Sequence, residues 1–121
     1  DANDRAGPTI HVFPGDKVTI RVTNHLPHRT SVHWHGLEVP NLMDGVPPLE
    51  PSPYIYPGEY FDYSFTICNP PGTYMYHSHV EVPIQDNAGL FGGLVMTICA
   101  FFRNGQSTFC PGAISHQVHI R

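Results

Sequence analysis

Four histidines in two short segments are the residues best suited to chemistry in this chain. Residues 31–36 read Ser-Val-His-Trp-His-Gly, and residues 72–79 read Gly-Thr-Tyr-Met-Tyr-His-Ser-His. Side chains two residues apart on a β-strand leave the same face, about 6 to 7 Å from each other. Two such strands side by side would direct four imidazoles into one small volume. The spacing therefore predicts a metal site with the ligands His33, His35, His77 and His79.

The donor type narrows the choice of metal. Imidazole suits copper and zinc, and copper(II) lies above zinc in affinity for such ligands. The other nitrogen of each ring needs a partner, often a carboxylate or a backbone carbonyl, for which Asp44 and Asp86 are candidates unless they are simply turn residues. A zinc site with three histidines and an open position for water is an alternative. No convincing general base lies near the motifs, so we expect copper.

Alternating apolar residues predict the strands that would position these histidines. Residues 17–24 and 59–67 each place their apolar side chains on one face, as half-buried strands do. Further strands are predicted over residues 8–13, 30–35, 73–79 and 92–98. Trp34, Tyr74 and Tyr76 occupy the alternate positions of the two strands that carry the histidines, so their side chains point to the face opposite the histidines. We expect these three aromatic residues in the core and the histidines on the outer face.

Composition favours one all-β domain and excludes several functional classes. Thirteen prolines and eleven glycines, with only six Lys and Arg residues, argue against a helical bundle. A length of 121 residues fits a single domain. The net charge of −4 and the scattered basic residues show no nucleic-acid footprint. No segment approaches the roughly 20 apolar residues of a membrane helix. We expect a β-sandwich or β-barrel with neither nucleic acid nor a membrane span.

Two regions depart from the strand pattern. The proline-rich connection over residues 40–57 contains an Asp44–Gly45 turn, and it either frames the site or forms a stiff surface loop. Residues 99–121 include His116 and His119, which are three positions apart. Only a helix or a turn would place both of them on the same side. We interpret this second region as a loosely held tail. His25 and His28 are expected to be solvated loop residues.

The cysteines give little information about the compartment. Cys68, Cys99 and Cys110 are too few and too irregular for a disulfide framework. Cys99 and Cys110 could pair and leave Cys68 free, or all three could be unpaired thiols. The polar first residues contain no apolar signal region, so the chain is either cytoplasmic or a mature secreted or periplasmic protein. We expect the secreted or periplasmic location.

The two histidine motifs and their surroundings resemble the N-terminal cupredoxin domain of multicopper oxidases, the laccase-like enzymes. The resemblance extends from Gly7 to Ile98 and depends chiefly on the paired His-x-His motifs. Shorter matches support it: Pro14-Gly-Asp16, Met43-Asp-Gly-Val-Pro47, Pro57-Gly58-Glu59 and Gly89-Leu-Phe-Gly-Gly93. The chain then divides into a cupredoxin-like domain over residues 1–98 and a tail of uncertain structure over residues 99–121.

The resemblance implies a Greek-key β-barrel or sandwich that supplies half the ligands of a trinuclear copper cluster. His33 would bind the type 2 copper, and the type 3 pair would be bound by His35, His77 and His79. In this family, electrons from a phenol, an amine or a metal ion reach the cluster from a separate type 1 copper, and four of them reduce dioxygen to water. No cysteine stands where a type 1 thiolate is expected, since Ser78 occupies the middle of the second motif.

The four histidines would reach such a cluster from one side only, so the ligands on its other side need a second source. The remaining donors would come from a second cupredoxin domain or from further copies of this chain in a dimer or trimer, and a twofold interface is the commonest dimer geometry. Two alternatives have no turnover: an inactive truncated fragment of a larger oxidase, and a copper-binding or copper-buffering module.

Overall fold

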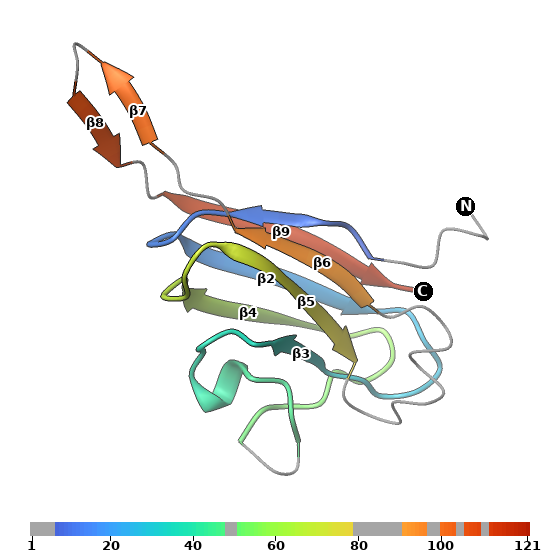
Figure 1. Ribbon diagram of the computed structural model, residues 1–121. Coiled ribbons are helices and arrows are strands. Elements are labelled where there is room, and N and C mark those ends of the chain that lie inside the picture. Colours follow the sequence, from blue (N-terminus) through green and yellow to red (C-terminus); the bar gives the residue numbers. More distant parts are fainter. Residues whose placement is uncertain (1–6, 48–50, 79–90, 97–99, 104–105, 110–111) are drawn as a thin grey trace.

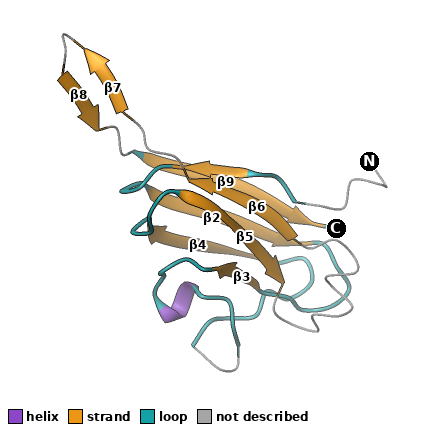
Figure 2. Cartoon of the chain, viewed as in Figure 1, coloured by secondary structure: helices purple, strands orange, loops and turns teal. Residues whose placement is uncertain are grey.

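In the part of the chain that the structure describes, the regular elements are β-strands, apart from one short 3₁₀ helix (Figure 2). The computed structural model describes residues 7–47, 51–78, 91–96, 100–103, 106–109 and 112–121. Among these residues, no helix is long and apolar enough to cross a membrane. The elements in chain order are β1 (Ile10–Val12), β2 (Lys17–Asn24), β3 (Val32–His35), η1 (Asn41–Met43), β4 (Tyr60–Thr66), β5 (Gly72–Ser78), β6 (Phe91–Met96), β7 (Ala100–Arg103), β8 (Gln106–Phe109) and β9 (Ala113–Ile120).

Two sheets form the body of the molecule. The first has the strand order β1-β6-β5-β3 and the second β4-β2-β9, while β7 and β8 form a hairpin that extends away from both (Figure 1). The β1–β6 and β2–β9 pairs are parallel, and the other pairs are antiparallel. The predicted all-β architecture and the strands that bear the histidines are confirmed.

The core lies between the sheets and is centred on Trp34, whose side chain is fully buried. Its ring centroid is 5.4 Å from that of Tyr63 on β4 and 5.4 Å from that of Tyr76 on β5. Phe65 adds a third ring at 5.5 Å. Aromatic rings at these separations attract one another in tilted and edge-on arrangements. Trp34 thus joins β3 and β5 of one sheet to β4 of the other, as its parity in the sequence predicts.

The C-terminal strand is where the structure differs from the expected loose tail. All eight residues of β9 pair in parallel with β2, from Lys17 opposite Ala113 to Asn24 opposite Ile120. Val118 and Ile120 are buried in the core. The alternation of polar and apolar residues in β9 is hard to recognise in the sequence. His116, opposite Ile20, occupies an inward position where an apolar residue is expected. His116 and His119 therefore lie on opposite faces of a strand.

Tyr63 connects the core to the histidine-bearing strand β3. Its hydroxyl accepts a hydrogen bond from the buried backbone N–H of Val32 at 3.0 Å. Burial raises the pKa of Tyr63 to about 12, although the hydrogen bond from Val32 acts in the opposite direction. The neutral hydroxyl is therefore the form that the folded protein prefers.

Removing the side chain of Ile120 should show how much β9 contributes to stability. We expect Ile120→Ala to lower the free energy of unfolding by about 2–5 kcal/mol, the usual cost of such a truncation in a core. Gln117→Ala, at an exposed position on the same strand, should change it by less than about 0.5 kcal/mol. Urea denaturation measures both values, and equal effects would mean that β9 is not part of the core.

Replacing Tyr63 should change the response of stability to alkali. Below pH 10, Tyr63→Phe should be less stable than the parent protein by about 1–3 kcal/mol, because the Val32 N–H loses its acceptor. Between pH 10 and 12 the unfolded parent releases the tyrosine proton while the folded parent retains it, so the parent's stability falls with rising pH.

The difference between parent and variant should therefore shrink by about 2–3 kcal/mol over that interval, since one pKa unit is worth about 1.4 kcal/mol. Urea denaturation at a series of pH values measures it. Tyr54→Phe, a half-buried loop position, is the control. A constant difference between Tyr63→Phe and the parent would show that the hydroxyl is not held neutral by burial.

Candidate metal centre

The antiparallel pairing of β3 with β5 brings the two histidine motifs together. His33 lies directly opposite His77, and His35 lies opposite Met75. Successive side chains alternate between the two faces of a sheet, so the burial of Trp34 and Tyr76 leaves the histidines on the outer face. His33 and His77 are half-buried there and His35 is exposed. The predicted outward orientation is confirmed for His33, His35 and His77.

Three of the four predicted ligands form a compact cluster. His33, His35 and His77 each offer one nitrogen, and these atoms lie within 4.8 Å of one another. The ring centroids are 6.0 Å apart for His33 and His35, 5.5 Å for His33 and His77, and 5.6 Å for His35 and His77. His79 lies outside the described residues, so its place in the cluster stays a prediction.

This spacing suits metal ions bound by neighbouring rings. Two nitrogens on one ion, each at about 2.0–2.1 Å, are at most about 4.2 Å apart. Nitrogens within 4.8 Å of one another can therefore bind a shared ion after small ring rotations, or adjacent ions as they stand. An imidazole binds a metal in its neutral form. A site made of imidazoles suits copper and zinc.

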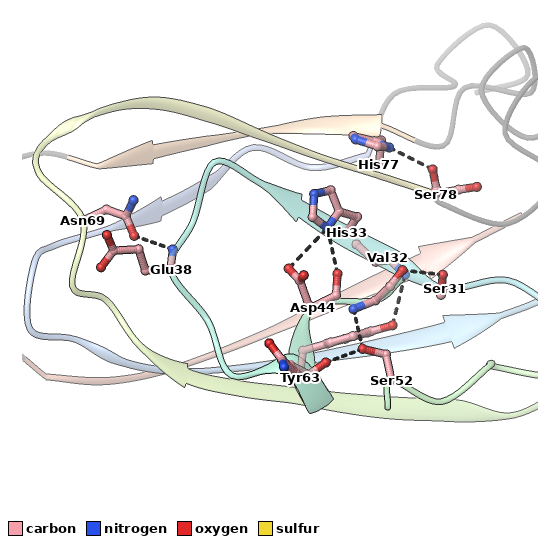
Figure 3. Close-up of polar contacts among 12 residues, drawn as sticks. Ser31, Val32, His33, Glu38, Asp44, Ser52, Tyr63, Asn69, His77 and Ser78 are labelled. Carbon is pink, nitrogen blue, oxygen red and sulfur yellow. Dashed lines mark hydrogen bonds and ion pairs between the residues drawn. The ribbon is translucent and has the colours of Figure 1, made fainter. Parts of the chain in front are cut away.

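Backbone carbonyls orient two of the three rings (Figure 3). The Nδ1 atom of His33 is 2.8 Å from the carbonyl oxygen of Asp44, and Nδ1 of His77 is 2.8 Å from that of Ser78. A carbonyl can only accept a hydrogen bond, so each Nδ1 must carry the proton and donate it. In a neutral ring the Nε2 atom is then the unprotonated nitrogen, which is the form that a metal binds. The residues present thus fit a copper site.

Asp44 contacts His33 in a second way. One carboxylate oxygen of Asp44, Oδ1, lies 3.3 Å from His33 Nδ1. The side chain therefore adds negative charge beside the same ring that its backbone carbonyl orients. The suggestion that Asp44 partners a ligand agrees with this geometry, whereas Asp86 lies outside the described residues.

Two serines fix the loop that carries Asp44, and sequence analysis missed both. Ser31 Oγ donates a hydrogen bond to the carbonyl of Gly45 at 2.8 Å, and the Gly45 N–H donates to Ser52 Oγ at 2.8 Å (Figure 3). Ser52 Oγ in turn donates to the carbonyl of Asn41 at 2.6 Å. These side-chain contacts to backbone groups hold residues 41–45 against β3. The proline-rich connection therefore frames the site.

Asn69 fastens the other end of β3 and was also missed. Its Oδ1 accepts from the N–H of Glu38 at 2.8 Å, and its Nδ2 donates to the carbonyl of Gly36 at 2.8 Å. Asn69 precedes β5 and Gly36 follows β3, so one amide ties together the chain segments next to both histidine strands. Its place in an Asn-Pro-Pro-Gly turn was the sole signal in the sequence.

Among the residues that the structure describes, no cysteine joins this cluster of imidazoles. Cys68 is a free, exposed thiol, and Cys99 and Cys110 lie outside the described residues. The described residues therefore do not test the two alternatives for Cys99 and Cys110, a disulfide or unpaired thiols.

Comparison with known proteins agrees with the geometry of the site. The family model described as multicopper oxidase matches residues 2–98. Over 90 residues, the chain is 47% identical to the multicopper oxidase MCE of Talaromyces pinophilus and 44% identical to copper resistance protein A of Pseudomonas syringae pv. tomato. These matches cover 73% and 74% of this chain but only 14% of each relative. The chain thus spans about a seventh of the length of these proteins.

Solved structures show the same relationship. The multi-copper oxidase of Pseudomonas thermotolerans superposes with a TM-score of 0.71 at 37% identity, over 79% of this chain and 24% of that one. A multicopper oxidase of Campylobacter jejuni, titled a metallo-oxidase, gives a TM-score of 0.67 at 41% identity, over 74% and 19%. The expected cupredoxin-like fold is confirmed by these similarities. With the family match covering most of its length, the chain belongs to the multicopper oxidase family.

Proposed function

We propose that this chain provides the histidine ligands on one side of a trinuclear copper cluster in a laccase-like oxidase. The observation that supports this most directly is the meeting of His33, His35 and His77, whose available nitrogens lie within 4.8 Å of one another. His79, two residues after His77, is the fourth ligand. His33 serves the type 2 copper, and His35, His77 and His79 serve the type 3 pair.

In this role the chain itself holds and orients imidazoles. Copper, when bound, would supply one-electron redox chemistry, so that four electrons from a phenol, an amine or a metal ion reduce dioxygen to water. The Asp44 and Ser78 carbonyls keep the protons of His33 and His77 on Nδ1. Because these contacts exist before metal binds, little ordering is needed when copper arrives.

The other half of the cluster has to come from a second protein surface. The three clustered donors lie on one face of a single sheet, on β3 and β5. A second cupredoxin domain is one source, and this agrees with the short span of the chain relative to its relatives. Further copies of this chain, in a dimer or a trimer, are the other source. A secreted or periplasmic location is part of the same proposal.

The second candidate is a copper-binding or copper-buffering module without turnover, which includes an inactive fragment of a larger oxidase. The same one-sided donor set favours it, because bound copper would lack the ligands from the opposite side. Oxygen consumption distinguishes the two candidates, since a buffer binds copper without consuming oxygen.

Substitution of the clustered histidines tests the site. We expect His33→Gln and His77→Gln each to weaken copper binding by at least about 10- to 100-fold, the loss seen even when groups that only support a ligand are removed. His28→Gln, on an exposed loop position, is the control and should bind as the parent does. Titration against a chromophoric chelator measures the affinity, and unchanged binding by His33→Gln would refute the site.

Oxygen uptake with a phenolic substrate, with and without copper, tests the oxidase. Uptake should require copper and should appear only in an assembly whose mass shows a partner domain or a second copy. Copper binding without uptake in such an assembly would favour the buffering module instead.

Gly45 offers a test of how the loop positions Asp44. Gly45 has a φ of 68° and an added Cβ would collide with the carbonyl oxygen of Val32 on β3. We expect Gly45→Ala to displace Asp44 from His33 and to lower copper affinity by about tenfold or more. The left-handed backbone costs an alanine about 1–2 kcal/mol in stability, in addition to the collision.

Gly58→Ala is the matched control for Gly45→Ala. Gly58 also has a positive φ, of 81°, but an added Cβ there meets nothing within 4 Å. This variant should lose a similar amount of backbone stability and keep the copper affinity of the parent. Equal copper affinities for the two variants would show that the Gly45 loop does not orient His33.

A further inference from the structure

We propose a second metal site, on the other sheet, in which His25 and His119 together bind a divalent transition-metal ion such as copper(II) or zinc(II). His25 Nε2 and His119 Nδ1 lie 3.0 Å apart, although the residues are 94 positions apart in the sequence. Their rings are stacked, with centroids 5.2 Å apart and planes inclined at 28°. Both side chains are exposed, so an ion can reach them from solvent.

The separation of the two nitrogens is what a metal ion requires. Imidazole nitrogens bind zinc and copper at about 2.0–2.1 Å, so adjacent ligands at 90–110° are about 2.8–3.4 Å apart. The observed 3.0 Å falls within that interval. Without metal, one ring donates a hydrogen bond to the other. To bind an ion, the donating ring moves its proton to its other nitrogen, and the rings turn so that both lone pairs converge on the ion.

The backbone holds both histidines in place before any metal binds. His119 lies on β9 opposite Thr23 of β2, and the N–H of His25 donates to the carbonyl of Ile120 at 2.8 Å. The loop around His25 is fixed by the fully buried Asn24. Asn24 Nδ2 donates to the carbonyls of His28 and Ile55 at 2.8 and 2.9 Å, and its Oδ1 accepts from the N–H of Leu26 at 2.9 Å.

This pair is separate from the histidine cluster of β3 and β5. It joins β9 to the loop that follows β2, in the sheet β4-β2-β9, whereas the cluster lies on the sheet β1-β6-β5-β3 (Figure 1). His116 does not take part, because it faces the opposite side of β9 from His119. One of its two ligands, His119, lies beyond residue 98, where the match to the multicopper oxidase family ends.

An ion at this position would fasten the C-terminal strand to the rest of the sheet. The two ligands come from near opposite ends of the chain, so the ion would close a long loop of the unfolded chain. A ligand that binds only the folded form stabilises it increasingly as the ligand concentration rises above the dissociation constant. We therefore assign this site a double role, binding a metal ion and holding β9 in place.

The test uses copper(II) and the full chain, in a background where the four proposed ligands of the copper cluster, His33, His35, His77 and His79, are all changed to glutamine. The clustered residues His33, His35 and His77 lie at exposed or half-buried positions on the outer face, so these changes should leave the core intact. We expect it to bind about one copper(II) ion, with an electron paramagnetic resonance signal from two nitrogen ligands. At a hundredfold excess over the dissociation constant, the thermal midpoint should rise by about 5–10 °C.

Adding His119→Gln or His25→Gln should lower the copper affinity by at least about tenfold, because a second ligand on the same ion binds at high effective concentration. At the same copper concentration, the rise in the thermal midpoint should fall by at least about half, because the stabilisation varies with the logarithm of the concentration over the dissociation constant. His28→Gln, in the same loop, should leave both unchanged. In the presence of a chelator, circular dichroism and thermal unfolding establish that each variant is folded.

Equal copper affinity in the His119→Gln and His28→Gln variants would overturn the proposal. The same holds for a two-nitrogen signal that survives both His25→Gln and His119→Gln. Because the background lacks the four proposed ligands of the copper cluster, neither outcome depends on the proposed oxidase function.

Discussion

The register between β3 and β5 is the constraint on which the metal centre depends. His33 faces His77 because Trp34 faces Tyr76 one position further along. A shift of one residue would turn every side chain of β3 to the opposite face. It would expose Trp34, which is now fully buried against three aromatic rings, and would bury imidazoles in its place. Burial of large aromatic side chains is among the strongest stabilising contributions in a core. The aromatic core therefore determines where the histidines point.

Hydrogen bonds to the backbone then determine how those histidines are oriented. The core sets the face and the spacing, but each imidazole could still rotate or carry its proton on either nitrogen. The carbonyls of Asp44 and Ser78 remove that freedom for His33 and His77. Asp44 is held in turn by a loop that Ser31 and Ser52 fasten to β3. Residues well outside the two motifs thus determine which nitrogen is offered to a metal.

The parts that could be predicted are those set by local alternation. The bounds of β2 agree with the predicted residues 17–24, and β5 begins one residue before the predicted 73–79, of which residue 79 lies outside the described part of the chain. Two His-x-His motifs on such strands were enough to predict that three histidines cluster. The supporting contacts of Ser31, Ser52 and Asn69 could not be predicted, because each depends on the path of a loop between strands.

The C-terminal strand shows why long-range pairing escapes local analysis. Its partner β2 lies almost the whole chain length away, and His116 interrupts its apolar face. A parallel pair needs no turn between its strands, so no hairpin signal marks it. Yet this pairing places His119 beside His25, which sequence analysis treated as an isolated loop residue.

The two histidine groups thus arise from the same physical cause. In each, strands pair because their apolar side chains are buried in the core, and this pairing brings imidazoles together on the outer face. The paired strands are β3 and β5 in one case and β2 and β9 in the other.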